Sequence, residues 1–331
     1  MSARYPHPIC RLTVAGDDIT AAVMKRLVSI SLTDNRGLDT DALEIQLSDH
    51  DGRLAIPPHR AEIRLWLGWS DTGLVYKGAY AVDETEHTGA PDTLTIRAHS
   101  ADLREQIKAK RERSWHQTSI GAVVQAIAGE HGLGNVIGEK LAGIAVPHID
   151  QANESDMHLL SRLAAQHDAI AQVKDGKLFF TPIGQGTTAK GTTLPHVTLT
   201  RADGDSHRFL QADRNTHTGA RAFYNELNSA LKESVIAGAE ANLKDIRHLY
   251  TDKAGAQAAA DAEWSRMQRG SATLSYTLAR GRPDLIPELT YSLHGIKPEI
   301  SAIRWLGGNV RHSFTDAGYT TSLELETDLD G

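Results

Sequence analysis

AEIRLWLGWSDTGLVYKGAYAVDETEHTGAPDTLTIRA, residues 61–98, contains the most regular pattern of the chain: three short strands separated by turns. Apolar residues alternate with polar ones at Ile63, Leu65 and Leu67, at Leu74, Tyr76, Tyr80 and Val82, and at Leu94, Ile96 and Ala98. A period of two with one apolar face predicts an antiparallel sheet that buries only one side. No nucleophile, metal cluster or phosphate loop lies in this stretch, which predicts a scaffold and not a catalytic site.

The composition of the 331-residue chain is that of a globular protein with two or three domains, since 40% of its residues are apolar and 23% are charged. Its net charge of −7 argues against nucleic acid as the main ligand, because phosphate binding requires a basic surface. The nearest feature to a basic run is diluted by glutamates, and we interpret it as a solvated connector. It consists of Lys108, Lys110, Arg111 and Arg113.

Cys10 is the one cysteine of the sequence, which excludes an internal disulfide and predicts synthesis in a reducing compartment. The N-terminus lacks the apolar core of a signal peptide, and no apolar run approaches the roughly 18 residues of a membrane helix. We therefore expect the protein to be made in the cytoplasm and to contain no membrane segment.

Residues 1–103 are rich in short strands, including 27–33 and 42–47, and predict a first β-barrel domain. After a polar linker at 184–191, strand patterning resumes and predicts a second β-barrel domain over residues 186–331. One helix near 254–269 interrupts this second domain. Two similar β domains around a different module suggest a duplication, although the sequence shows no repeat that would prove it.

Residues 104–185 predict a small α/β domain with two helices and a β-hairpin. Apolar residues from Ile120 to Ile127 recur at helical spacing after Thr118, the expected N-cap. A second helix is predicted from about Ser155 to His167, with Asn153 as a capping residue. Asp175-Gly176 between two apolar stretches predicts a two-residue hairpin turn. The expected fold is therefore α+β and mainly β, with two related β-barrel domains flanking a small α/β domain.

The sequence contains only weak candidates for metal-binding, phosphate-binding or catalytic residues. The sixteen histidines are scattered without the spacing of a zinc site, and we interpret them as surface or capping residues. The glycines between 129 and 138 follow a helix instead of opening one, which favours helix termination over a phosphate loop. The carboxylate pairs Asp83/Glu84 and Asp49/Asp51 lie in turn-like or strand-edge positions, where solvation accounts for them. We expect no catalytic, cofactor-binding or metal-binding residues, and no cofactor.

Trp66 and Trp69 flank Gly68 and form an aromatic pair that could bind a sugar or a protein partner. Packing beneath the next hairpin is the favoured interpretation of these two side chains.

Two segments contain motifs that are specific enough to suggest a relationship to known proteins. Residues 149–156 contain Gln151-x-x-Glu154-Ser155-Asp156 and lead into a leucine-rich helix, and residues 110–121 read KRERSWHQTSIG. Weaker matches lie at 89–98, at 213–215 with 220–224, and at 318–325. Together these segments resemble the late control protein D family, the tail hub proteins of contractile phages, over most of the chain.

The resemblance implies a homotrimer in which each subunit contains two related β-barrels and an α/β domain. Similar hubs occur in R-type pyocins and at the head of type VI secretion spike proteins. Two barrels per subunit would give six quasi-equivalent barrels, which can meet a six-fold tail tube on one side and a three-fold spike on the other. Because the chain stops at Gly331, we expect the spike to be a separate protein.

We therefore expect a structural baseplate hub protein and not an enzyme, incorporated into the tail baseplate of a phage virion or phage-tail-like particle after synthesis in the bacterial cytoplasm. Its expected partners are further copies of itself, a central spike protein, the tail tube protein, a tape-measure protein and other baseplate subunits. Specific binding to nucleic acid is not expected. The alternatives are a tail-associated cell-wall hydrolase, a metallohydrolase, or a carbohydrate-binding barrel that uses Trp66 and Trp69.

Two expectations concern the surface. Arg162, Gln166 and Lys174 of the α/β domain are expected to face neighbouring baseplate proteins at the periphery of the ring. The acidic C-terminus predicts a channel wall that repels a duplex polyanion, or else a frayed tail, and in both cases its charges would be exposed and of little importance for folding. Its carboxylates are Glu324, Glu326, Asp328 and Asp330.

Overall fold

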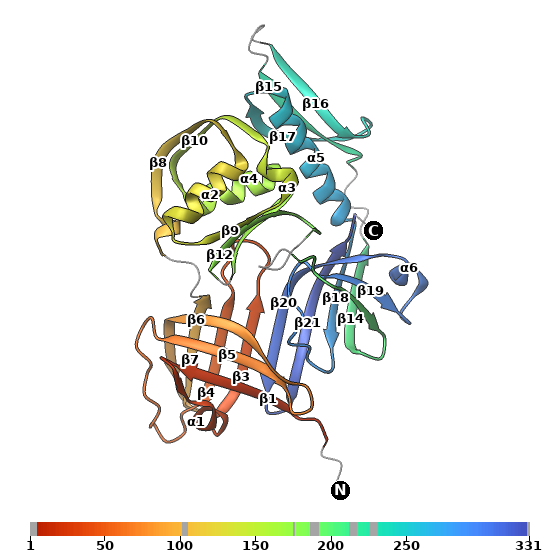
Figure 1. Ribbon diagram of the computed structural model, residues 1–331. Coiled ribbons are helices and arrows are strands. Elements are labelled where there is room, and N and C mark those ends of the chain that lie inside the picture. Colours follow the sequence, from red (N-terminus) through yellow and green to blue (C-terminus); the bar gives the residue numbers. More distant parts are fainter. Residues whose placement is uncertain are drawn as a thin grey trace.

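The computed structural model of the chain describes residues 5–100, 105–174, 176–185, 192–211, 217–225 and 231–329. The fold is mainly β, as predicted, and one 13-stranded sheet runs through both the N-terminal and the C-terminal part of the chain (Figure 1). A mixed α/β module and a smaller inserted unit lie together at one end of this sheet.

The N-terminal β region, red to orange in Figure 1, supplies the strands ordered β3-β4-β7-β6-β5-β1-β2. Its elements are β1 (Pro8–Val14), β2 (Asp17–Asp18), α1 (Thr20–Met24), β3 (Leu27–Asp34), β4 (Ala42–Ser48), β5 (Glu62–Trp69), β6 (Gly73–Thr88) and β7 (Thr93–Ser100). Inward residues alternate on β5 and β7 as predicted, and Leu65 is fully buried.

β6 departs from the expected alternation at its start. The register of β5 against β6 shifts between Leu65 and Trp66, so a β-bulge at Lys77 reverses the side on which the preceding residues lie. Leu74 and Tyr76, predicted to point inward, are 40% and 44% exposed. Lys77 takes the inward position, and its side chain is only 3% exposed.

The α/β module contains both predicted helices and the predicted hairpin, together with a two-stranded sheet and a third helix that we did not predict. Its elements are η1 (Glu105–Lys108), β8 (Lys110–Ser119), α2 (Ile120–Glu130), β9 (Gly134–Ile137), α3 (Glu139–Ala142), β10 (Ala145–Ser155), α4 (Asp156–Gln166), β11 (Ala169–Lys174) and β12 (Lys177–Pro182). Lys174 pairs with Lys177 across the hairpin turn. Asp175 of that turn lies outside the described residues.

Both predicted helix N-caps are one or two residues away from the observed ones. Ser119, not Thr118, caps α2, because its hydroxyl accepts a hydrogen bond from the N–H of Ala122 at 3.2 Å. Ser155, not Asn153, caps α4 in the same way. In both cases the last residue of the preceding strand is also the N-cap, so the strand passes directly into the helix.

The C-terminal β region comprises β13 (His196–Thr200), β14 (Gly204–Gln211), β18 (Ala272–Leu278), β19 (Thr290–His294), α6 (Pro298–Ser301), β20 (Trp305–Thr315) and β21 (Gly318–Thr327). The predicted helix near 254–269 is confirmed, but it belongs to a larger inserted unit with its own three-stranded sheet. This unit consists of β15 (Gly219–Asn225), β16 (Lys232–Gly238), β17 (Leu243–Tyr250) and α5 (Lys253–Arg269). Ala256, Ala260 and Trp264 of α5 pack against this three-stranded sheet.

The two β regions are joined by antiparallel pairing of β3 with β20. Phe314 and Tyr319 of the C-terminal region complete the hydrophobic core of the N-terminal region. Among the described residues, the strand order contains no pairing that closes either region by itself. The arrangement as two barrels therefore stays a prediction.

The β-bulge makes a testable distinction between two leucines on adjacent strands. Leu65→Ala should lower the free energy of unfolding by about 2–5 kcal/mol because it leaves a cavity in the core. Leu74→Ala should cost less than about 1 kcal/mol, because Leu74 already faces solvent. Chemical denaturation of the two variants measures both values, and equal losses would contradict the register of β6.

Candidate functional site: the junction of the four parts

The loop between β3 and β4, residues 35–41, is here termed the joint loop because it contacts both the α/β module and the C-terminal β region. Its shape is held by its own polar groups. The N–H of Asn35 donates to Oδ1 of Asp41 at 2.8 Å, and the side-chain amide of Asn35 donates to the carbonyl of Thr40 at 2.8 Å. Gly37 has a φ of +91°, a backbone conformation that side chains with a Cβ rarely adopt.

Leu38 at the tip of the joint loop is part of the hydrophobic core of the α/β module. It is 7% exposed and clusters with buried residues of the module such as Leu163 and Ala171. Burial of a leucine side chain contributes about 1.5–3 kcal/mol, so this contact stabilises docking of the module on the N-terminal β region.

Lys174, at the end of β11, donates to the carboxylates of Asp34 and Asp41, the latter at 2.5 Å. Burial opposes the charge on Lys174, but the two carboxylates outweigh it and raise its pKa above the usual value. Burial raises the pKa of Asp41 against the opposing effect of Lys174. Lys174 therefore faces the N-terminal β region, and the prediction that it faces a neighbouring protein is corrected.

Lys77, placed inward by the β-bulge, lies on the other side of Asp34. Its ammonium group is 3.8 Å from the Asp34 carboxylate and donates to the carbonyl of Pro283 at 3.1 Å. Burial lowers the pKa of Lys77, which is partly offset by Asp34. This lysine therefore binds the C-terminal β region to the same carboxylate that holds the α/β module.

A chain of alternating charges starts at Arg36 of the joint loop. Arg36 forms ion pairs with Glu288 and, at 2.6 Å, with Glu326 of the C-terminal β region. Glu326 also lies 3.3 Å from Arg269 at the end of α5. Arg269, 6% exposed in its side chain, pairs in turn with Asp168 of the α/β module at 2.7 Å. These five residues connect the N-terminal β region, the C-terminal β region, the inserted unit and the α/β module, which are the four parts of the chain.

Glu288 provides a second connection to the module. Its Oε2 accepts a hydrogen bond from the backbone N–H of Gly184 at 2.9 Å, just after β12. Burial raises the pKa of Glu288, while Arg36 and the Gly184 N–H act in the opposite direction.

The C-terminal carboxylates take part in internal contacts. Glu326 belongs to the charge chain, and Asp328, whose side chain is 3% exposed, pairs with Arg304 at 2.8 Å. Glu324 accepts a hydrogen bond from Asn309 at 3.2 Å, and Asp330 lies outside the described residues. The expectation of exposed charges unimportant for folding is therefore wrong for Glu326 and Asp328.

Asp156, the first residue of α4, is the centre of a separate buried network inside the module. Its carboxylate accepts hydrogen bonds from Arg113 at 2.6 Å and Gln151 at 2.8 Å, and it lies 2.8 Å from Nε2 of His131. Burial opposes ionisation, but these bonds and the arginine charges outweigh it and hold the pKa of Asp156 below its usual value. The Gln-x-x-Glu-Ser-Asp motif is thus a structural element that caps α4 with Ser155 and anchors it to β8.

The basic run belongs partly to this network. Arg111 and Arg113 lie on β8 and bind Glu130 at the end of α2, at 2.5 and 2.7 Å. Our interpretation of a solvated connector is therefore wrong for these two arginines. Their acidic partners are distant in the sequence, so no local pattern identifies them.

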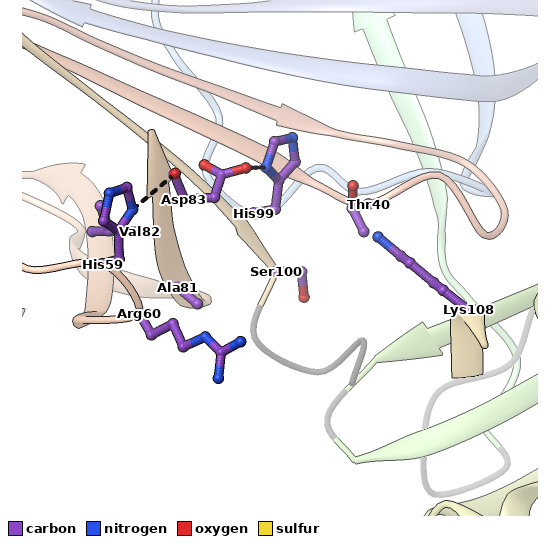
Figure 2. A pocket seen from close by; sticks show the side chains of 9 residues that line it. All are labelled: Thr40, His59, Arg60, Ala81, Val82, Asp83, His99, Ser100 and Lys108. Carbon is purple, nitrogen blue, oxygen red and sulfur yellow. Dashed lines mark hydrogen bonds and ion pairs between the residues drawn. The ribbon is translucent and has the colours of Figure 1, made fainter. Parts of the chain in front are cut away.

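An open pocket of about 520 Å³ lies beside β6, β7 and η1 (Figure 2). His59 Nδ1 lies 3.1 Å from the carbonyl of Asp83, and His99 Nδ1 lies 2.5 Å from its carboxylate. Figure 2 shows the two rings on opposite sides of Asp83, so their free edges do not converge on one point. Arg60 and Lys108 also line the pocket. In the described part of the chain, no three His, Cys, Asp or Glu side chains are placed to hold a metal ion.

The two tryptophans do not form one aromatic surface. Trp66 packs on Tyr76, with ring centroids 5.0 Å apart, on the outer face of β5. Trp69 packs against the core, and its indole N–H donates to the carbonyl of Gly281 at 2.8 Å. Trp69 therefore joins the two β regions, while Trp66 packs beneath the next hairpin as the favoured interpretation predicts.

Taken together, the continuous sheet, the docked module and the charged junction define a mainly β protein whose parts are joined by buried charges. The phage tail baseplate hub family (GPD) matches residues 25–318, and the chain belongs to this family. The chain is 40% identical to the probable baseplate hub protein of Escherichia phage 186, over 97% of this chain and 93% of that protein.

Solved structures show the same fold. A tail protein from Neisseria meningitidis MC58 superimposes with a TM-score of 0.71 at 14% identity, over 97% of both chains. The E. coli c3393 protein superimposes with a TM-score of 0.57 at 12% identity, over 96% of this chain and 76% of that one. That protein is described as a component of the type VI secretion system with structural similarity to the T4 tail proteins gp27 and gp5.

Family membership confirms the resemblance found in the sequence, and with it the prediction of a structural tail protein that is not an enzyme. No helix among the described residues has the length and apolar character needed to cross a membrane.

The buried network of the module can be tested at its central carboxylate. Asp156→Ala should lower the free energy of unfolding by about 3–5 kcal/mol, because it removes the buried carboxylate that Arg113 and Gln151 bind and leaves Nε2 of the buried His131 without this partner. Asp150→Ala is a matched control, since this exposed carboxylate should contribute less than about 1 kcal/mol. Urea denaturation of both variants gives the comparison, and similar losses would exclude a special role for Asp156.

The lowered pKa of Asp156 also predicts a dependence of stability on pH. A carboxylate whose folded pKa lies below the ordinary value of 3.8 contributes stability above that pH and loses it as the pH falls through the folded pKa. The unfolding free energy of the parent should therefore decline below a pH of about 4 more steeply than that of Asp156→Asn. Denaturation curves between neutral and acidic pH test this, and parallel declines would refute it.

Proposed function

We propose that this baseplate hub protein forms a homotrimeric ring that joins the six-fold tail tube to a three-fold central spike. One observation carries the proposal: two β regions with their own hydrophobic cores lie side by side in one sheet, joined through β3 and β20. Three copies would place six such regions around one axis, with heterologous contacts that close a ring.

In this proposal the chain divides into a first barrel at residues 1–103, an α/β domain at 104–185 and a second barrel at 186–331. The barrels line the channel, and the α/β domain lies at the periphery, where Arg162 faces other baseplate subunits; Gln166 lies beside Gly255 of α5 instead of facing a neighbour. Arg162 is held in place by Glu154 at 2.7 Å, so this part of the surface is ordered before any partner binds.

The proposed partners are further copies of the chain, the tail tube protein, a central spike protein, a tape-measure protein and other baseplate subunits. The protein acts by matching symmetries, with no chemical step, no cofactor and no specific binding to nucleic acid. It is made in the bacterial cytoplasm and then incorporated into the baseplate.

The stoichiometry of the assembled baseplate tests the ring. Native mass measurement of the hub released with its spike should give three times the 36.0-kDa mass of one chain in addition to the mass of the spike. The isolated protein can still be a monomer at low concentration, so the assembled particle is the decisive sample. A two-fold dimer in that particle would contradict the ring.

Incubation of purified protein with peptidoglycan distinguishes the structural role from a cell-wall hydrolase. We expect no turnover. Turnover that is lost on changing one carboxylate would instead support the hydrolase.

A further inference from the structure

A cleft of about 490 Å³ lies between the α/β module and the inserted unit, which are neighbours in Figure 1. One wall is β10 with the residue that precedes it, and the other is the end of β17 with the first turns of α5. Helix α4, which lies against α5, contributes residues to the same cleft.

The cleft opens along the edge of β10 and not over one of its faces. Successive side chains of a strand point to opposite faces, so a cleft over one face would be lined by every second residue. Here every residue from 144 to 150 lines the cleft. Among the described residues β10 is hydrogen-bonded to β8 alone, so its second edge has no strand partner. Pro147, in the middle of this stretch, has no N–H to donate, which is typical of an edge strand.

The backbone groups on this edge follow from the register of β10 against β8. The N–H of Ile120 donates to the carbonyl of Ile144 at 3.0 Å, so these two residues form a hydrogen-bonded pair. The next pair, Ser119 with Ala145, is therefore of the non-hydrogen-bonded kind. In such a pair the N–H and C=O of Ala145 point away from β8, where they can bind a further strand.

The side chains around this edge are mainly apolar and would pack against apolar side chains of an added strand. They are Ile144, Val146, Ile149, Leu163, Ala254 and Ala258.

The two carboxylates that line the cleft are already engaged within the chain. Asp150 accepts hydrogen bonds from Ser114 at 2.5 Å and from His148 at 3.1 Å. Asp252 is the N-cap of α5. A bound chain therefore finds few free acceptors among the side chains of the cleft.

Donors, in contrast, are available. Arg162 uses Nε and Nη2 to bind Glu154 and the carbonyl of Asp150, and no described group binds its Nη1. The rings of His167 and His248, which also line the cleft, form no hydrogen bond within the described chain. This surplus of donors, one of them cationic, suits a carboxylate on the bound chain.

We propose that the cleft binds an extended segment of a different protein, which adds a strand to β10 and directs a carboxylate to Arg162. In strand addition the main chain supplies affinity, and the side-chain sites beside the edge supply specificity. That this protein is a neighbouring baseplate subunit rests on the function proposed above. A second copy of the hub is not the occupant, because in the proposed ring the β regions and not the module contact the next subunit.

A photo-reactive residue identifies the occupant in the assembled tail. Ala254 is exposed and lines the cleft, so p-benzoylphenylalanine placed there reaches a bound chain. The matched control carries the same group at Ala241, an exposed alanine of the inserted unit outside the cleft. Mass spectrometry should find one acidic segment of another protein, cross-linked at least about fivefold more from position 254 than from 241.

Equal yields at both positions, or a cross-link to a second copy of the hub, would overturn the proposal. Trimerisation is measured separately by the native mass, so an empty cleft in a trimeric hub counts against this proposal alone.

A synthetic peptide with the cross-linked sequence then tests the chemistry by fluorescence anisotropy with the full-length hub. Replacing its acidic residue by the amide should weaken binding about tenfold, because a charge-assisted bond to Arg162 is lost. Ala254→Trp should abolish binding by filling the cleft, while Ala241→Trp should leave it unchanged, and circular dichroism confirms that both variants are folded. Undiminished binding to a folded Ala254→Trp protein would place the site elsewhere and refute the proposal.

Hydrogen exchange of the unaltered protein tests strand addition without any variant. The amide of Ala145 should exchange at least about tenfold more slowly in the assembled tail than in the isolated hub, because it gains a hydrogen-bond partner. The amide of Ile120 is the internal control, since it is already bonded to Ile144 in both states. The same exchange rate of Ala145 in tail and isolated hub would be incompatible with an added strand.

Discussion

The ammonium group of Lys174 between the carboxylates of Asp34 and Asp41 is the interaction on which the arrangement of this hub depends. Charged groups removed from water are tolerated only where partners of opposite sign and hydrogen bonds replace the lost hydration. Here the partners come from different parts of the chain, so the charges are satisfied only when the parts are docked correctly. Arg36, Glu326 and Arg269 repeat this arrangement a short distance away. The junction thereby specifies the relative placement of the parts more than it adds to their stability.

The strands and helices that bury one regular face could be predicted from the sequence. The alternation on β5 and β7 and the helical spacing on α2 and α4 match the observed burial. β6 could not be predicted in full, because a bulge changes which side faces inward and has no local signature in the sequence. The three-stranded sheet that precedes α5 was merged with the second β domain, since both share the same alternating pattern.

The junction was beyond prediction for a different reason. Asp34, Asp41, Lys174 and Glu326 look like ordinary surface charges in the sequence, and their partners are distant in it: Lys174 is 133 residues from Asp41, and Glu326 is 290 residues from Arg36. Asp156 is an intermediate case. The motif around it was recognised through resemblance to a family, but its role as a buried helix anchor follows only from the positions of Arg113 and His131.

The pairing of β3 with β20 has a consequence for the biosynthesis of the chain. β3 ends at Asp34, and its partner strand begins at Trp305, so the N-terminal sheet keeps an unpaired edge until β20 has been made. Phe314 and Tyr319, which complete the N-terminal core, emerge from the ribosome long after β3. Contacts between such distant segments form slowly, and an unpaired strand edge readily recruits other chains. The nascent hub is therefore vulnerable to aggregation until β20 and β21 have been made.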